Sequence, residues 1–357
     1  MIPEPSEQER IITSPLASLV LAGMIILGGC SDDKQTDRRT GVPFDSVFAL
    51  AGTIVLEESP TDPIVDLKNI SVAPDGRVLF ADHRAARVRV FDENGHAIAT
   101  FGRHGEGPGE FQRPLDGRFV GGEIFVTDPG SGRITRYDSN FELDTILTSP
   151  GGLPANLVTD GSDLVLLTGA PAFVLKISRD GEVQHTFATP DSSAYSVPYW
   201  GSILDRSATV LGNDLVVATN LLYPLWRHDL SGATTDSVGV APQSFIAASK
   251  PERGRFAGAA QAEVSDWLRT FSVLDRIETY RDSVLLVVHG RFEPYPGEPW
   301  NLVHTTLDAY DSSYRKLLED IVLPGRLLGA DDYIYILLGE PPDAWTIGRY
   351  TFRPTSD

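Results

Sequence analysis

Residues 79–92 read LFADHRAARVRVFD, and residues 125–138 read FVTDPGSGRITRYD. The two stretches align without a gap, and their matching aspartates, Asp82 and Asp128, are 46 residues apart. A repeat of about 40–50 residues that contains several short strands is typical of the blades of a β-propeller. The repeat therefore predicts an all-β protein in which each unit forms one blade.

Within each unit the residues predict short antiparallel strands. Residues 87–91, RVRVF, alternate charged and apolar side chains, which indicates a strand with one buried face. Turn-forming residues occur where the chain must reverse, at Pro74-Asp75-Gly76 and at Asn94-Gly95. Later units contain the same succession of strands and turns, with weaker motifs. We therefore expect six blades within residues 44–357.

Two segments depart from the repeat. The strand predicted for Ser46–Leu56 has no blade of its own, whereas the last blade lacks its outer strand. We expect the first to complete the second, because a closed ring leaves no exposed sheet edge. Residues 251–270 have a helical composition, with Ala262, Trp267 and Leu268 on one face, and are predicted to form an insertion between the fourth and fifth blades.

The connection between the first two units resembles a known family. Residues 101–114, FGRHGEGPGEFQRP, together with Asp128 and Arg133, are similar to the NHL repeat of bacterial six-bladed propellers. In that family the glycine-rich run crosses from the last strand of one blade to the first strand of the next, and the Asp and Arg are structural. The resemblance covers residues 65–145 and is faint in the later blades.

The N-terminal segment predicts that the protein is located in the cell envelope. The apolar run Ile11–Leu27 is followed by two glycines and Cys30, an arrangement that resembles the bacterial lipobox. The resemblance implies a signal peptide over residues 1–29, lipidation of Cys30, and a polar tether over residues 30–43. Ser31 after the cysteine implies the outer membrane by the best-known sorting rule.

The alternative is an uncleaved membrane helix. The first ten residues contain three Glu and one Arg, where a signal peptide normally begins with positive charge. The apolar run is close to the lower limit for a membrane span. In both cases the propeller faces away from the cytoplasm. Cys30 is the single cysteine of the chain, so an internal disulfide is excluded.

Composition limits the partners. The formal net charge of −19 argues against nucleic-acid binding, which requires Lys and Arg to neutralise phosphates. It also disfavours adhesion of the protein surface to anionic lipids. We therefore expect contact with the membrane through the N-terminal lipid, and an envelope protein, a peptide or a carbohydrate as the partner of the propeller.

Candidate ligand-binding residues follow from the geometry of propellers, whose innermost strands line a central channel. Counting back from the second strand of each unit gives six positions at the channel mouth: Asn69, Asp116, Asn156, Ser207, Arg276 and Arg326. Amide and carboxylate oxygens in the first three units could bind Ca²⁺. The arginines of the last two would favour an anion. The competing interpretation is that these residues satisfy one another and the strand ends.

No catalytic motif decides the function. There is no nucleophile elbow, phosphate loop or His-Glu-x-x-His motif. The seven histidines lack metal-ligand spacing, and His289, at the end of an apolar strand, is expected to be a hydrogen-bonded core residue. Aromatic side chains gather in three Pro-containing stretches and could bind sugars or peptides, or pack between blades: Tyr195, Tyr199, Trp200, Tyr223, Trp226, Tyr295 and Trp300.

Three functions stay open at this point. The leading hypothesis is a binding or protein-interaction module without catalysis. The alternative is a metal-dependent hydrolase or lyase at the channel mouth, because related propellers include calcium-dependent lactonases and a peptide-amidating lyase. A lactonase would need a glutamate beside its asparagines, and Glu278 is near one of the predicted positions. The third is a structural subunit of an envelope complex.

Overall fold

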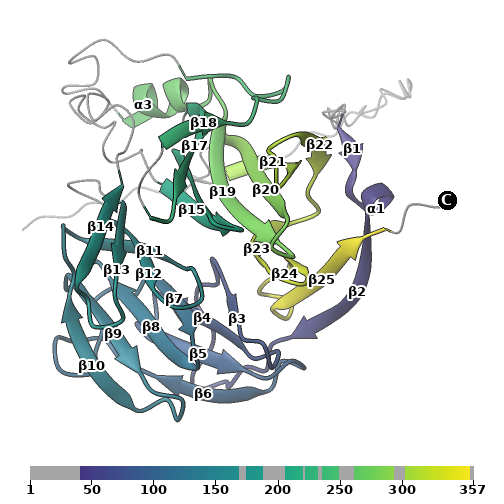
Figure 1. Ribbon diagram of the computed structural model, residues 1–357. Helices are drawn as coiled ribbons and strands as arrows, with labels where there is room; N and C mark the ends of the chain where they lie inside the picture. Colours follow the sequence, from purple (N-terminus) through teal and green to yellow (C-terminus); the bar gives the residue numbers. More distant parts are fainter. Residues whose placement is uncertain are drawn as a thin grey trace, which may run out of the picture. The chain divides into compact units, whose positions relative to one another are not determined.

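The computed structural model describes residues 41–168, 174–187, 206–219, 222–231, 235–248, 261–292 and 302–353. These residues form six β-sheets arranged around a central axis (Figure 1). Five sheets contain four strands, and the fifth in chain order contains five. The chain is therefore a six-bladed β-propeller, as the repeat predicts.

Each blade is an antiparallel meander, numbered here from one to six. Blade one consists of β3 (Ser71–Val72), β4 (Val78–Asp82), β5 (Arg87–Phe91) and β6 (Ala97–Phe101). Blade two consists of β7 (Asp116–Val120), β8 (Glu123–Asp128), β9 (Arg133–Tyr137) and β10 (Leu143–Thr148). Blade three consists of β11 (Pro154–Thr159), β12 (Leu164–Thr168), β13 (Val174–Ile177) and β14 (Val183–Phe187). Blade four consists of β15 (Arg206–Leu211), β16 (Asp214–Thr219), β17 (Leu222–Asp229) and β18 (Thr235–Val238). Blade five consists of β19 (Val273–Tyr280), β20 (Val284–Phe292), β21 (Leu302–Asp311), β22 (Lys316–Val322) and β1 (Val42–Pro43). Blade six consists of β23 (Arg326–Ala330), β24 (Ile334–Gly339), β25 (Thr346–Phe352) and β2 (Phe48–Val55).

The core lies between the blades. Successive residues of a strand point to opposite faces of the sheet, so each blade contributes to two hydrophobic clusters. In β4, Val78 and Phe80 pack against blade six, whereas Leu79 packs against blade two. The same alternation in the second strand of every blade produces six clusters, one for each pair of neighbours. These strands are buried on both faces, so they are continuously apolar.

The ring closes through strands from the two ends of the described chain. The strand β2 pairs antiparallel with β25, with Ile54 opposite Ile347, and lies beside it in Figure 1. The side chain of Ile54 is buried in the cluster between blades six and one. The expectation that Ser46–Leu56 completes the last blade is therefore confirmed. The two-residue strand β1 pairs in parallel with β22, with Val42 opposite Ile321.

The two matching aspartates, Asp82 and Asp128, hold the segments that enter blades one and two. The fully buried carboxylate of Asp82 accepts hydrogen bonds from the backbone N–H groups of Val65 and Asp66, at 3.0 and 3.1 Å. Asp128 accepts the equivalent bonds from residues 112–113, at 2.8 and 2.9 Å. Each of these segments leads into the innermost strand of the same blade. The carboxylates therefore fix the inner strands around the channel and serve the fold.

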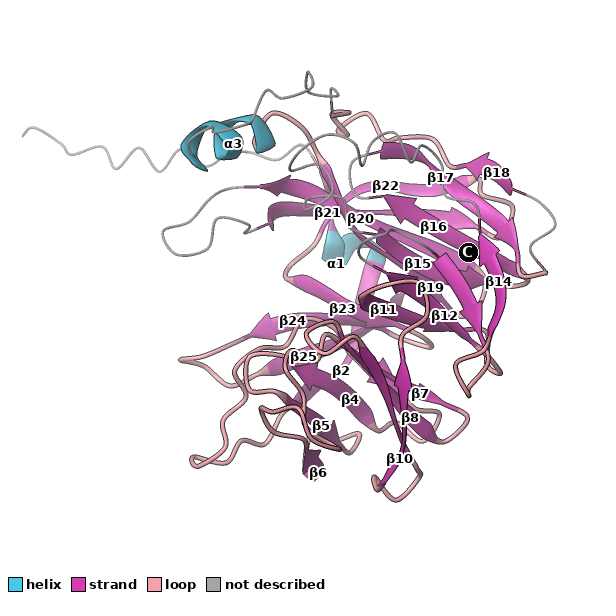
Figure 2. Ribbon diagram, turned by 90° about the vertical axis from the view of Figure 1, so that its left-hand side faces the viewer, coloured by secondary structure: helices cyan, strands magenta, loops and turns pink. Residues whose placement is uncertain are grey.

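Helices are few among the described residues. The helix α3 (Gln261–Leu268) lies beside the sheets and within none of them (Figure 2). It occupies the end of the predicted insertion and buries Trp267 and Leu268, and residues 251–260 lie outside the described ranges. The four-residue helix α1 (Phe44–Val47) precedes β2. Over the described ranges, no helix has the length and hydropathy needed to span a membrane.

Candidate ligand-binding channel

The six predicted mouth residues lie at or near the N-terminal ends of the innermost strands. Asn69 lies two residues before β3, Asp116 and Arg326 begin β7 and β23, and Ser207 is the second residue of β15. Two lie further along their strands because of local irregularities: Asn156 in β11 and Arg276 in β19, each beside a register shift. All six positions therefore lie in the first half of an inner strand or just before it.

Asp116 connects three blades. Its side chain is fully buried, and its Oδ1 accepts a hydrogen bond from the amide of Asn69 at 2.9 Å. Its Oδ2 accepts from the backbone N–H of Leu157 at 2.9 Å and from Arg118 Nε at 3.2 Å. Both carboxylate oxygens are thus engaged by neighbouring inner strands. Asn156, one residue before Leu157, is half-buried.

On the opposite side of the ring, further contacts join neighbouring blades around the channel mouth. The hydroxyl oxygen of Ser207 accepts a bond from the backbone N–H of Ile277 at 3.0 Å, which joins blades four and five. Arg276 donates to the carbonyl oxygens of Leu328, at 2.6 Å, and Lys68, at 3.1 Å, and so connects blade five to blades six and one.

Arg326 completes this positive side of the mouth. It donates to the carbonyl oxygen of Leu67. Burial, and secondly the positive charge of Arg276, lower the pKa of Arg326. The two guanidinium groups therefore lie close enough to repel each other. The contacts described above engage the side chains of five of the six predicted positions: Asn69, Asp116, Ser207, Arg276 and Arg326.

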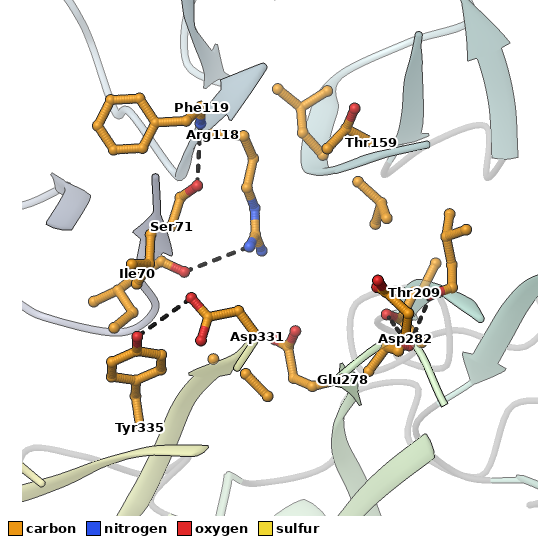
Figure 3. Close-up of a pocket in the computed structure, with 18 residues that line it drawn as sticks. Ile70, Ser71, Arg118, Phe119, Thr159, Thr209, Glu278, Asp282, Asp331 and Tyr335 are labelled. Atoms are coloured by element: carbon orange, nitrogen blue, oxygen red, sulfur yellow. Dashed lines mark hydrogen bonds between the residues drawn. The ribbon is translucent and has the colours of Figure 1, made fainter. Parts of the chain in front are cut away.

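A cavity of about 230 Å³ lies further along the channel than the predicted mouth. All six inner strands, or the turns that follow them, contribute to its wall (Figure 3). The polar side chains of the wall are those of Ser71, Arg118, Thr159, Thr209, Glu278, Thr279, Asp282, Asp331 and Tyr335. Ser71, Arg118, Thr209 and Glu278 each lie two residues beyond a predicted mouth position, because alternate residues of a strand share one face.

Two partly buried side chains of opposite charge, Arg118 and Glu278, belong to the wall of the channel. The side chains of Arg118 and Glu278 are 20% and 13% exposed, and both point into the space shown in Figure 3. Burial raises the pKa of Glu278, although Arg276, 3.4 Å away, and Arg118 act to lower it. For Arg118, burial acts to lower the pKa, and the carboxylates of Asp116 and Glu278 outweigh it and raise the pKa. The two groups therefore stabilise each other's charge inside the channel.

Two further carboxylates belong to the wall. Burial raises the pKa of Asp331, which accepts hydrogen bonds from the backbone N–H of Tyr333 at 2.8 Å and from the hydroxyl of Tyr335 at 3.2 Å. Asp282 lies in the turn after β19 with a positive φ of 51°. The wall thus contains three carboxylates and one guanidinium group among its charged side chains, so its field favours a cation or a hydrogen-bond donor.

The aromatic stretches are described only in part. Tyr195, Tyr199, Trp200, Tyr295 and Trp300 lie outside the described residues. Tyr223 packs edge-on against Phe245 at 4.9 Å, in the cluster between blades four and five. Trp226 packs against the cluster between blades three and four. The two described aromatics therefore contribute to packing between blades.

Comparison with known proteins identifies the class of fold. The model of a family described as "6-bladed beta-propeller" matches residues 32–146. A solved structure of a Bacteroides fragilis NCTC 9343 protein thought to be exported is similar, with a TM-score of 0.59 at 12% identity over 88% of this chain and 97% of that one. A member of the DUF4221 family from Bacteroides vulgatus gives 0.60 at 12% identity, over 86% and 98%.

A third structure, virginiamycin B lyase from Staphylococcus aureus, gives a TM-score of 0.49 at 15% identity, over 85% of this chain and 99% of that one. That likeness is too weak to bear on activity. No curated protein matches the sequence. The two structures from Bacteroides therefore show a similar fold and leave the function to the site itself.

Proposed function

We propose that this chain is a lipid-anchored propeller of the cell envelope that binds a small, amine-bearing polar molecule in its central channel. The observation that carries the proposal is the polar cavity of about 230 Å³ to which all six blades contribute, with the partly buried Glu278 in its wall. Burying a carboxylate has a free-energy cost. Burial raises the pKa of Glu278, although Arg276 and Arg118 act to lower it. A cationic ligand would add to the effect of the two arginines.

The composition of the wall supports this class of ligand. Glu278, Asp282 and Asp331 offer acceptors for an ammonium group, and Ser71 and Thr209 offer hydroxyls for further hydrogen bonds. The volume is below the range of about 300–1,000 Å³ typical of pockets for drug-sized molecules, which favours a smaller ligand. An amino sugar combines one ammonium group with several hydroxyls. A carbohydrate is one of the three partner classes expected from the sequence, with an envelope protein and a peptide.

The proposed location in the cell envelope rests on the N-terminal sequence, which lies outside the described residues. The apolar run, Cys30 and the polar segment after it support lipidation at Cys30 and attachment to the outer membrane. The similarity of the connection at residues 101–114 to NHL repeats supports a relationship to bacterial envelope propellers. The B. fragilis structure, thought to be exported, is consistent with this location.

The test compares three sugars of one shape. The full chain in detergent is heated with glucosamine, glucose or glucuronate, and the unfolding midpoint is measured. We expect glucosamine to raise the midpoint and glucuronate to leave it unchanged. The variant Glu278→Gln should lose this shift, and Glu182→Gln, which changes an exposed carboxylate, should keep it. If none of the sugars shifts the midpoint, or if glucuronate gives the largest shift, the proposed ligand class is wrong.

The hydrolase or lyase alternative would place Ca²⁺ at the channel mouth. A calcium site needs several free oxygen atoms that converge. Both oxygens of Asp116 accept hydrogen bonds, and Asn69 presents its amide N–H₂ to that carboxylate. These contacts favour the binding module. Calcium titration of the full chain decides between them: binding that Asn69→Ala or Asn156→Ala abolishes would favour the enzyme. Co-purification with a partner after gentle crosslinking would favour the third hypothesis, a subunit of an envelope complex.

A further inference from the structure

A second group of buried polar side chains lies in blade five, away from the channel wall. His289 on β20, Asp308 on β21 and Asp320 on β22 come from three adjacent strands. One ligand atom from each lies within 4.8 Å of the other two. The side chains of His289 and Asp308 are 4% and 0% exposed, whereas Asp320 is 22% exposed and gives the group an opening to solvent.

The local structure of β21 and β22 brings the two carboxylates together. A register shift lies between Leu307 and Ala309, so that Asp320 falls opposite Asp308. The backbone N–H of Asp320 donates to Asp308 Oδ1 at 2.9 Å, and Asp320 adopts a positive φ of 55°. Such bulges commonly redirect a side chain next to a functional site. Here the bulge turns both carboxylates toward the imidazole.

The unusual atom in this group is Asp308 Oδ2. It is buried, and among the described residues no donor forms a hydrogen bond to it. It lies 3.2 Å from His289 Nε2 without forming a hydrogen bond to the ring. Within the described ranges, neither Asp308 nor Asp320 forms an ion pair with Lys or Arg. Buried charges in proteins are normally paired or coordinate a metal ion.

The distances fit a small divalent cation. His289 Nε2 is 3.2 Å from Asp308 Oδ2 and 3.8 Å from Asp320 Oδ1. Tetrahedral Zn²⁺ with bonds of about 2.0–2.2 Å separates its ligand atoms by about 3.4 Å. One imidazole with two carboxylates is a ligand set that suits Zn²⁺ better than Ca²⁺, which prefers six or more oxygen atoms.

The groups around the three side chains complete the site. The hydroxyl of Ser244 donates to Asp320 Oδ1 and orients that carboxylate, as outer partners of metal ligands commonly do. The ring of Phe245 lies edge-on to His289 at 5.8 Å and limits access of water. The hydroxyl of Thr306 lies 3.0 Å from His289 Nε2 and is the group with which a cation would compete for that nitrogen.

We propose that His289, Asp308 and Asp320 form a Zn²⁺ site that joins three strands of blade five. Three protein ligands leave a fourth position for water. The cation would compensate the two carboxylates and hold β20, β21 and β22 together. Through Ser244 it would also hold the segment that follows β18. The site is independent of the ligand proposed for the channel, so the two can fail separately.

The test is a titration of the full chain in detergent after removal of metals by a chelator. Calorimetry with Zn²⁺ should give one ion per chain, and the ion should raise the unfolding midpoint. Asp308→Asn and Asp320→Asn should each abolish binding, while Ser244→Ala should weaken it about 10–100-fold. The matched control is His96→Gln, which changes an exposed histidine 3.0 Å from Asp92 and should bind as the unaltered chain does.

Three results would overturn the site: no Zn²⁺ binding, binding that survives in both Asp→Asn variants, or Ca²⁺ binding in preference to Zn²⁺. Asp308→Asn changes a buried group and could unfold the blade, which circular dichroism would detect. The partly exposed Asp320→Asn then carries the test, since its side chain can be solvated without disturbing the core.

Discussion

The side-chain amide of Asn69 donates a hydrogen bond of 2.9 Å to Asp116, and this bond joins the first strands of two consecutive blades. The two residues lie 47 positions apart in the chain, about one repeat. The same carboxylate reaches Leu157 in the third blade. One buried aspartate thus links three neighbours at the channel mouth.

Replacing that carboxylate should destabilise the whole ring. Asp116→Ala leaves the N–H of Leu157 and the amide of Asn69 without an acceptor, and we expect a loss of about 3 kcal/mol in the free energy of unfolding. Urea denaturation measures it. Asp180→Ala removes a carboxylate whose side chain is 81% exposed beside Arg136, and should cost less than about 1 kcal/mol. Equal losses in the two variants would contradict the role assigned to Asp116.

Ring closure should depend on the buried face of β2. Ile54→Ala removes a side chain that is 1% exposed, and we expect a loss of about 3 kcal/mol in unfolding free energy from the cavity that it leaves. Leu50→Ala on the same strand removes a side chain that is 55% exposed and should change stability by less than about 0.5 kcal/mol. Thermal or urea unfolding of the two variants compares the two faces directly.

Glu278 should make stability depend on pH. Its folded-state pKa is raised above the ordinary value of 4.5, so the folded chain binds this proton more tightly than the unfolded chain does. The resulting loss of stability is absent below about pH 4.5 and complete above the folded-state pKa. Glu278→Gln removes this loss, so the variant should gain stability relative to the unaltered chain as the pH rises from 4 to 8.

Urea unfolding at several pH values measures this difference. The exposed Glu182→Gln variant is the control and should show no pH-dependent difference from the unaltered chain. A Glu278→Gln variant that is most destabilised at pH 8 would show that the ion pair of Glu278 with Arg276 and the charge of Arg118 outweigh its burial.

Membrane attachment should depend on Cys30. A thiol is required for acylation, so Cys30→Ser should move the protein from the membrane fraction to the soluble fraction of a bacterial lysate. The alternative of an uncleaved helix makes the opposite prediction, because the apolar residues 11–27 are unchanged in the variant. Mass spectrometry of the N-terminus provides an independent measurement.

The sequence predicted the number of blades and the closing strand because both depend on local signals. Turn residues and period-2 alternation recur along the chain, and Asp82 matches Asp128 in the first two units. The predicted mouth positions lie near the starts of the inner strands, because each was counted back from the second strand of its unit. The cavity lies two residues deeper, at Arg118 and Glu278, and the sequence contains no signal for how far along a channel the free space lies.

The group in blade five was not predicted. His289, Asp308 and Asp320 lack the spacing of a metal motif, because they come from three strands and meet across a bulge. The sequence indicated only that His289 lies at the end of an apolar strand, which suggested an ordinary core histidine. Register shifts of this kind arise from tertiary packing and cannot be deduced from alternation alone.

The arrangement of β1 and β2 has a mechanical consequence. Tension on an anchored N-terminus would reach the parallel bridge of β1 to β22 first, where two residue pairs are in register. The longer ladder between β2 and β25 lies behind it and also closes the ring. If the N-terminus is anchored by a lipid as proposed, force on it would separate β1 from β22 before it reached the ladder that closes the ring. The propeller would then stay folded while β1 is detached.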